Sequence, residues 1–151
     1  MVLRRFLAGP GTLGALPAGM RIRCVEASDA AAIHHALSQE DEATPELSTW
    51  TRDFFGPEGI SLRYSLVGDT DDGVLVTFAL VDGDGLVRCF GTRASWRRRG
   101  AATALVGRVC ELARRNGGSS VRFERSASGA ARGLLVALGF REDAPGNDAS
   151  S

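Results

Sequence analysis

One segment, residues 86–115, constrains the fold more than any other, because it joins a strand to a long helix through a short arginine-rich turn. The strand "LVRCFGTR" ends near Arg93, and a helix is predicted from about Arg99 to Arg115. Its apolar residues recur at spacings of three and one, the stripe of an amphipathic helix with one buried face. These residues are Ala102, Leu105, Val106, Val109, Cys110 and Ala113. Such a stripe indicates that one side of the helix faces the core.

The turn before this helix has the chemistry of a phosphate site. The first turn of a helix has free N–H groups and the positive end of the helix dipole, and both attract an anion. Gly100 has no Cβ and lets the backbone approach a ligand closely, while Thr103 adds a hydroxyl donor. The alternative is a solvated basic turn or a nucleic-acid patch. The candidate phosphate-binding residues are Arg97, Arg98, Arg99, Gly100, Ala101, Ala102 and Thr103.

The remaining chain reads as alternating helices and strands. From Met20 we expect a strand, then an Ala-rich helix capped by Ser28 or Asp29, then a second helix over "ELSTWTRDFF". An antiparallel meander of three strands follows, "SLRYSLVG", "VLVTFALV" and "LVRCFGTR", and the Asp-Gly repeat at 82–85 predicts a hairpin. After the long helix come a strand at about 119–125 and a shorter helix ending at Gly139. This order predicts an α/β or α+β fold with a mixed sheet and flanking helices.

The length of 151 residues and the hydrophobic content of 44% predict one globular domain. We assign that domain to residues 20–141. Glycine and proline interrupt any apolar run in residues 1–19, so we expect a flexible extension there, or a start at Met20. Residues 142–151 are polar and predict a disordered tail.

Composition argues against several classes of function. Eighteen basic and eighteen acidic residues cancel, so no net charge favours nucleic acid or a membrane surface. No apolar run approaches the roughly 20 residues of a membrane span. The widely spaced Cys24, Cys89 and Cys110, with His34 and His35, have no spacing typical of a metal site. We therefore expect reduced thiols, no metal and a cytoplasmic location.

Two motifs resemble a known family, the GNAT superfamily of N-acetyltransferases. Arg97-x-x-Gly100-x-Ala102 is similar to the Q/R-x-x-G-x-G/A signature that binds the pyrophosphate of CoA in that family. "SGAARGLLVALGF" is similar to a later helix of the family, which ends in L-G-F at Leu138-Gly139-Phe140. The resemblance covers about residues 20–140.

This resemblance implies a mainly antiparallel sheet whose fourth and fifth strands splay apart into a V-shaped slot. The pantetheine arm of acetyl-CoA lies in that slot in the family, so Phe90, Gly91 and Thr92 are expected to border it. Ser128 and Leu135 match positions of the later helix that lie near CoA. The implied activity is transfer of an acetyl group from acetyl-CoA to a small-molecule or peptide amine.

The sequence departs from the family in two respects. The family often has a tyrosine at the position of Leu135, as a general acid near the CoA sulfur, and an asparagine at Ser128. Only eleven residues follow Phe140, so the usual last two strands are missing or reduced. We expect Leu135 to face either the slot or the core. Because the last two strands are missing or reduced, we expect the fifth strand to keep an open edge. A homodimer or another chain is predicted to cover that edge.

No Ser/His/Asp or Cys/His set for nucleophilic catalysis is recognisable in the sequence, and Glu124 is the candidate general base. It lies on the predicted fifth strand, although an ion pair with Arg122 or Arg125 is an equal alternative. The missing tyrosine and the short C-terminus leave a second reading open, a non-catalytic acyl-CoA-binding or regulatory domain of the same fold.

Overall fold

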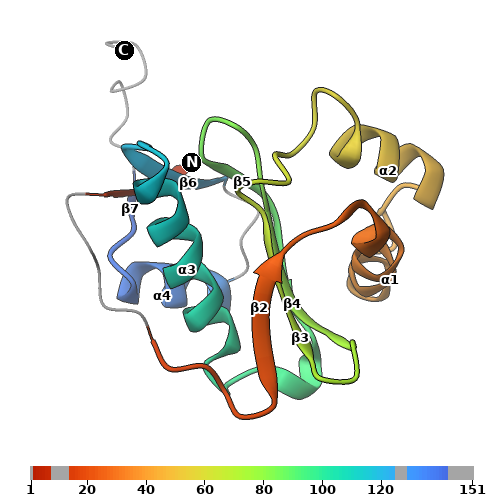
Figure 1. Ribbon diagram of the computed structural model, residues 1–151, viewed down its shortest axis with the longest axis horizontal. Helices are drawn as coiled ribbons and strands as arrows, with labels where there is room; N and C mark the ends of the chain where they lie inside the picture. Colours follow the sequence, from red (N-terminus) through yellow and green to blue (C-terminus); the bar gives the residue numbers. More distant parts are fainter. Residues whose placement is uncertain (1, 8–13, 125–128, 143–151) are drawn as a thin grey trace.

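The computed structural model describes residues 2–7, 14–124 and 129–142, and within them it shows one sheet between two layers of helices (Figure 1). The strands stand in the order β2-β3-β4-β5-β6-β1-β7. They are β1 (Val2–Phe6), β2 (Met20–Cys24), β3 (Leu66–Thr70), β4 (Leu75–Val81), β5 (Leu86–Thr92), β6 (Ser120–Glu124) and β7 (Arg141–Glu142). The helices are α1 (Ala30–Glu40), α2 (Leu47–Phe55), α3 (Ala101–Arg115) and α4 (Gly129–Ala137), with single 3₁₀ turns at Ala27–Asp29 and Ala94–Trp96.

The sheet is mainly antiparallel, which confirms the predicted fold class. Strands β2 to β5 form a continuous antiparallel series, and β1 is antiparallel to both β6 and β7. The one parallel pair joins β5 to β6, and α3 provides the crossover connection that such a pair requires.

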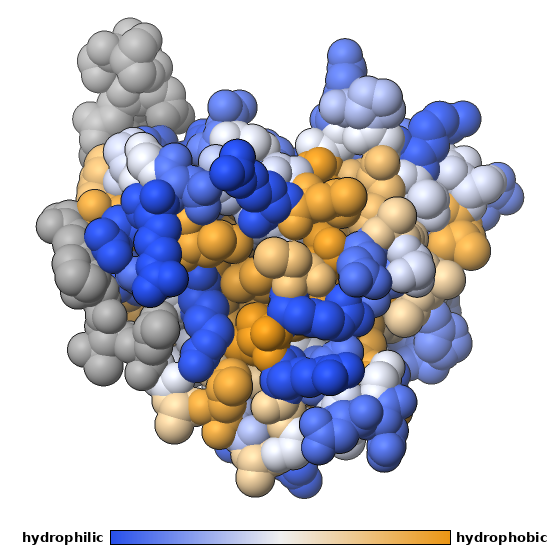
Figure 2. Space-filling model, in the orientation of Figure 1, coloured by the Kyte–Doolittle hydropathy of each residue, from blue (hydrophilic) through white to orange (hydrophobic). Residues whose placement is uncertain are grey.

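The two helical layers enclose separate cores. On one face, α3 and α4 cover a cluster that includes Leu105, Val109, Leu135 and Phe140. On the other face, α1 and α2 cover a cluster built around Trp50 and its neighbours. A strip of hydrophobic surface is visible near the middle of the face that Figure 2 shows. No described helix combines the length and the apolar character needed to cross a bilayer.

The N-terminal residues differ from the sequence expectation of a flexible extension. Val2–Phe6 form β1, which pairs with β6 along five residues and with β7 along two. Leu3 supplies the physical reason, since its side chain is only 5% exposed and packs in the core beneath α3 and α4. The edge of β6 predicted to be open is therefore covered by the chain itself. The argument for a homodimer that rested on this edge no longer holds.

The third strand begins later than predicted. Residues 61–65 form a turn, closed by hydrogen bonds from the Tyr64 and Ser65 N–H groups to the Ser61 carbonyl. The buried Ser65 hydroxyl accepts from the Val81 N–H at 2.8 Å and donates to the Ser61 carbonyl at 2.7 Å. These bonds satisfy backbone groups that a longer strand would have paired, so β3 starts at Leu66.

A network of charged side chains fixes β2 to the start of α1. The buried Asp69 carboxylate accepts from Arg21 Nε at 2.9 Å and from Arg23 Nε at 3.0 Å. The two terminal nitrogens of Arg23 donate to Asp29 at 2.9 and 2.8 Å. Asp29 is the N-cap residue of α1, as predicted, but its carboxylate turns back to Arg23 and to the Glu26 N–H. The hydrogen bonds from Arg23 lower the pKa of Asp29 below its usual value.

The packing of β1 predicts that Leu3→Ala lowers the free energy of unfolding by about 2–4 kcal/mol, because it empties a filled core position. Phe6→Ala, on the same strand at a side chain that is 71% exposed, is the matched control and should change it by less than about 1 kcal/mol. Urea unfolding measures both. Equal effects of the two variants would show that β1 does not pack as described.

The pKa of Asp29 predicts a pH-dependent contribution to stability. A carboxyl whose pKa is lower in the folded state stabilises the fold above its unfolded pKa and loses this effect as the pH falls through the folded value. Asp29→Asn should cost about 1 kcal/mol at neutral pH, since solvent partly screens the pair, and progressively less in acid. Thermal unfolding from pH 7 to pH 2 tests this, with the exposed Asp53→Asn as control. A deficit that persists undiminished at pH 2 would contradict the assignment.

Candidate functional site

The parallel pairing of β5 with β6 is short, and this creates the most distinctive feature of the sheet. Among the residues that the structure describes, Leu86 and Val87 are the ones that pair with β6, opposite Arg122 and Phe123. At this point the register of β5 against β4 shifts, with Leu80 opposite Cys89 but Val81 opposite Val87. Arg88 is therefore the extra residue of a β-bulge. A bulge bends its strand and increases its twist, so β5 turns away from β6 directly after their last pair. The bulge is consistent with the implied splay of these strands.

Beyond the bulge, Arg88–Thr92 form a segment that we call the free edge of β5, because within the described residues no strand pairs with it on the β6 side. The Arg93 N–H donates to the Val76 carbonyl of the β4 side at 2.7 Å. In an antiparallel pair, successive residues direct their backbone groups toward and away from the partner in alternation. Gly91 therefore faces β4, whereas Phe90 and Thr92 direct their N–H and C=O groups toward the free edge.

Gly91 has a packing role at this position. A Cβ atom built on it would lie 2.7 Å from the ring of Phe78, so any side chain would displace that ring. On the opposite face of the sheet, the Phe90 ring packs edge-to-face against Phe123 with centroids 5.6 Å apart. This contact closes the α3 face where the two strands begin to diverge.

The start of α3 has the geometry that the arginine-rich turn predicts for anion binding. Arg98 has a φ of 64° and Gly100, the N-cap residue, has a φ of 84°. The first intrahelical bond runs from the Ala104 N–H to the Gly100 carbonyl, and no side chain caps the helix. The N–H groups of the first turn therefore have no intrahelical acceptor. A Cβ on Gly100 would meet nothing within 4 Å, so the space beside this turn is open.

The first residues of α3 divide between core and surface. The Ala101 side chain is 1% exposed and packs with Met20, Val76 and Ala104, so only its backbone remains for a ligand. Ala102 and Thr103 are half-buried at the surface. The buried stripe of α3 includes Ala101 where the sequence had predicted Ala102.

The three arginines of the turn are exposed, and two of them have defined partners. Arg97 donates from Nε to the Thr92 carbonyl at 3.2 Å and forms an ion pair with Glu40 at the end of α1. The guanidinium of Arg99 lies over the Trp96 ring, 5.0 Å from its centroid. Arg97 thereby joins the turn to the far end of the free edge of β5.

Three of the remaining predicted site residues have different outcomes. Leu135 is fully buried and packs with Phe123 and Phe140, so the alternative left open by the sequence resolves in favour of the core. The expectation that it lines the slot is wrong, because the inward stripe of α4 includes it. Glu124 is the last residue of β6, and its backbone lies opposite Val2. Its side chain and the whole of Ser128 lie outside the described residues.

The cysteines and the potential metal ligands that the structure describes do not form a second candidate site. Burial raises the pKa of the Cys89 thiol to about 12, so it remains protonated and apolar. Among the described residues, no group of three His, Cys, Asp or Glu side chains could hold a metal ion. Arg88 was not among the site residues predicted from the sequence. A charged residue inside an otherwise apolar strand was the signal that could have identified it.

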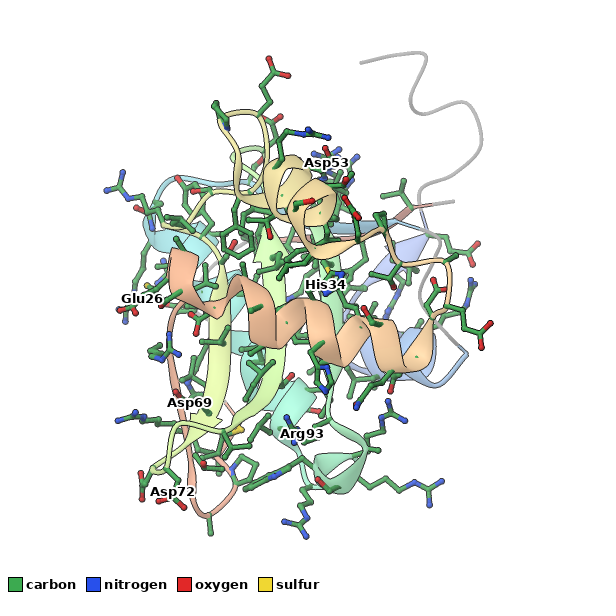
Figure 3. All side chains as sticks on the ribbon, turned by 90° about the vertical axis from the view of Figure 1, so that its right-hand side faces the viewer. Glu26, His34, Asp53, Asp69, Asp72 and Arg93 are labelled. Carbon is green, nitrogen blue, oxygen red and sulfur yellow. The ribbon has the colours of Figure 1, made fainter. Side chains whose placement is uncertain are left out.

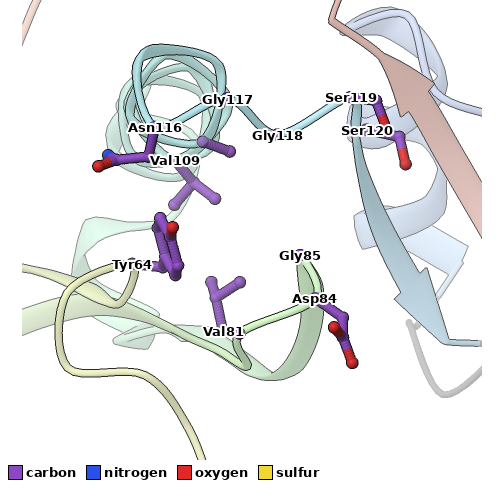
Figure 4. Close-up of a pocket in the computed structure, with 12 residues that line it drawn as sticks. Tyr64, Val81, Asp84, Gly85, Val109, Asn116, Gly117, Gly118, Ser119 and Ser120 are labelled. Atoms are coloured by element: carbon purple, nitrogen blue, oxygen red, sulfur yellow. The ribbon is translucent and has the colours of Figure 1, made fainter.

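A cavity of about 310 Å³ lies at the C-terminal end of α3 (Figure 4). Tyr64, the only tyrosine of the chain, forms one wall against Val81 and Val109, and the 82–85 hairpin and residues 116–120 surround the opening. Because α3 is about 22 Å long, this cavity is far from the arginine-rich turn at the other end of the helix.

The fold matches solved structures of acetyltransferases. A GCN5-related N-acetyltransferase from Sphaerobacter thermophilus superposes with a TM-score of 0.74 and 23% identity, over 93% of this chain and 47% of that one. AAC(6′)-Iy in complex with the bisubstrate analogue CoA-S-monomethyl-acetylneamine gives 0.66 and 18%, over 82% and 91%. An acetyltransferase from Clostridium acetobutylicum with acetyl-CoA gives 0.64 and 15%, over 83% and 92%.

The chain thus spans about half the length of the Sphaerobacter protein. At identities below 25%, these likenesses establish a shared fold. The sequence itself matches no protein-family model and no curated protein.

The burial of Leu135 predicts how stability and activity respond to the tyrosine that the family often has at this position. Leu135→Tyr should lower the free energy of unfolding by about 1–3 kcal/mol by overpacking the core, and it should add no acetyl-transfer activity. Val136→Tyr is the control, on the same helix at a side chain that is 44% exposed, and should leave stability nearly unchanged. Melting temperature and CoA thiol release are measured together. A gain in activity without loss of stability would place Leu135 beside the CoA sulfur instead.

Proposed function

We propose that this chain, whose fold is that of the GCN5-related N-acetyltransferases, transfers an acetyl group from acetyl-CoA to an amine. The observation that carries the proposal is the combination of a free β5 edge with an uncapped, glycine-started helix at its end. One element offers backbone donors to a thioester and the other offers backbone donors to a pyrophosphate. The neighbours solved with a CoA analogue and with acetyl-CoA support this choice of co-substrate.

The turn before α3 fits the phosphates of CoA. The first-turn N–H groups of α3 would donate to the pyrophosphate, and Arg98 and Arg99 would add positive charge beside it. The open space at Gly100 supports this assignment, because a phosphate can approach the backbone there. Arg97 would contribute from its place between Glu40 and the end of β5.

The free edge of β5 would hold the acyl end. The N–H groups of Phe90 and Thr92 are directed to that edge and can donate to a pantetheine amide or to the thioester carbonyl oxygen as it gains negative charge. Acetyl-CoA supplies an activated acyl group whose leaving group is a thiolate. Gly91 contributes indirectly, because its missing side chain lets Phe78 pack beneath the strand.

The reaction then needs a neutral amine and an outlet for the thiolate. The amine nitrogen forms a bond to the acyl carbon, the carbon–sulfur bond breaks, and the amine proton passes to a base. We assign that base to Glu124 on β6 or to water. A thiol with a pKa near 8.5 leaves readily, and water can protonate it afterwards. The buried Leu135 therefore does not prevent turnover.

The absence of a phenol at position 135 favours one other function, a non-catalytic acyl-CoA-binding or regulatory domain. The two functions differ in turnover only. Release of CoA thiol from acetyl-CoA, followed over a panel of amines, peptides and polyamines, separates them. Binding of acetyl-CoA without release for any acceptor would favour the non-catalytic function.

The phosphate assignment predicts that Gly100→Glu weakens CoA binding by about 100-fold or more, because a carboxylate at the helix start repels the pyrophosphate. The left-handed φ at Gly100 also predicts a loss of stability of about 1–2 kcal/mol. Gly117→Glu is the matched control, since Gly117 has a φ of 83°, has open space around its Cβ position and lies at the other end of α3. Calorimetry with CoA should show normal affinity for this control. Unchanged affinity in folded Gly100→Glu would refute the site.

A further inference from the structure

We propose that Arg88 binds a carboxylate on the acceptor, and that the acceptors of this protein are small amines bearing a carboxylate group. The proposal deepens the proposed function and rests on it. It starts from a guanidinium at the bulge of β5 whose hydrogen-bonding groups are unused among the described residues.

Arg88 lies on the face of the sheet that α1 and α2 cover. Its guanidinium stacks over the ring of Phe54 in α2, 5.1 Å from the centroid. Phe54 is in turn packed against Trp50, with centroids 5.0 Å apart, and Trp50 is buried. Figure 3 shows the molecule from this side, with α1 and α2 in front of the sheet. The arginine is thus held on an aromatic support that belongs to the core.

Stacking of this kind occupies the flat face of a guanidinium and leaves its N–H edge free. Five donors lie in the plane of the group, in a geometry that matches the two oxygens of a carboxylate. Within the part of the chain that the structure describes, every ion pair involves arginines other than Arg88. The N–H edge of the exposed Arg88 is therefore available to a carboxylate of a ligand.

The position of Arg88 places this edge on the side from which an acceptor would approach. The proposed phosphate site belongs to α3, on the opposite face, and the Phe90–Phe123 contact closes that face beside the divergence of the strands. An amine approaching the free edge of β5 must then come from the α1 and α2 side. Arg88 is the first residue of the free edge on that side.

The distance along β5 limits the size of the acceptor. Arg88 and Phe90 are two residues apart, and the bulge at Arg88 makes their separation along β5 shorter than the roughly 6.6 Å of a regular strand. If a thioester carbonyl is held at the Phe90 N–H, the attacked amine and a carboxylate bound by Arg88 are a few bonds apart. An amino acid, or another short amino-carboxylate, has this spacing, whereas an extended polyamine has no group for Arg88.

The acidic stretch at 40–46 is the competing argument, because it would suit a polycationic acceptor. Three of its four carboxylates have partners within the protein, whereas the exposed Glu42 has none among the described residues. Glu40 pairs with Arg97, Asp41 accepts a backbone N–H at 2.9 Å and Glu46 accepts a serine hydroxyl at 2.9 Å. The positive charge of Arg88, which has no ion-pair partner among the described residues, therefore favours an acceptor with an anionic group over a polycationic one.

Matched acceptor pairs test this proposal. Leucine is compared with isopentylamine, and phenylalanine with phenethylamine, so that each pair differs by the carboxylate alone, and spermidine represents the polycations. Release of CoA thiol gives kcat/KM for each. We expect the carboxylate member to be preferred. Arg88→Gln should lower its kcat/KM by about 10- to 100-fold, mostly through KM, as expected for the loss of a bidentate charged contact.

The variants are chosen to separate recognition from structure. Arg88→Gln should lower kcat/KM of the carboxylate member about tenfold or more relative to that of the amine without a carboxylate. Arg88→Lys retains the charge without the fork and should give an intermediate loss. Arg52→Gln removes an exposed arginine from α2 and should leave the preference intact.

Each outcome decides one of the two proposals. Preference for spermidine or for the amines without a carboxylate, or an equal effect of Arg88→Gln on both members of a pair, overturns the inference and leaves the proposed function standing. Failure to bind acetyl-CoA refutes the proposed function itself. If acetyl-CoA binds without turnover, calorimetry of the same pairs on the CoA-loaded protein decides. Binding of the carboxylate members that does not depend on Arg88 would then overturn the inference.

Discussion

The rest of the proposed site depends on the short parallel contact between β5 and β6. Over the described part of the chain, two residues of each strand pair, and the bulge at Arg88 then turns β5 aside. A longer ladder would use the backbone groups of Phe90 and Thr92 within the sheet, and none would remain for a ligand. Because the bulge lies at the last pair, the same distortion both opens the edge and exposes the Arg88 side chain on one face.

The contact can be short because β6 is held on its other edge. The chain's N-terminal strand pairs with β6 along its whole length, and Leu3 packs its side chain under α3 and α4. Within the described residues, every residue of β6 therefore pairs with β1 on one edge, whereas only two residues pair with β5 on the other. The fold in this way retains an unpaired strand edge near the proposed site while covering the edge that would otherwise invite another chain.

Four of the eighteen arginines of this lysine-free chain show two different uses of the guanidinium group. Arg21 and Arg23 meet Asp69 and Asp29 in a partly buried network that holds β2 against α1. Arg88 and Arg99 instead stack on aromatic rings, which support the guanidinium without neutralising it. A planar cation with both a face and an edge allows this division, since stacking on the face leaves the edge for an anion.

Much of the architecture follows from local sequence. The amphipathic stripe of α3, the hairpin at 82–85 and the glycine-started helix after Arg97–Arg99 are local patterns, and side-chain periodicity and turn chemistry act over a few residues. They place the phosphate-binding candidates together and order the central strands. Comparison with the family motif then adds the splay of the two strands, which local patterns alone do not contain.

What only the tertiary structure decides are relations between distant segments. The pairing of Val2–Phe6 with β6 joins residues more than a hundred positions apart, so no local pattern reveals it. Leu135 borders the inward stripe of its helix, and only the packing of Phe123 and Phe140 around it decides that it belongs to the core. The bulge at Arg88 arises from the register between β4 and β5, and a register is a property of two strands, which neither strand's sequence specifies by itself.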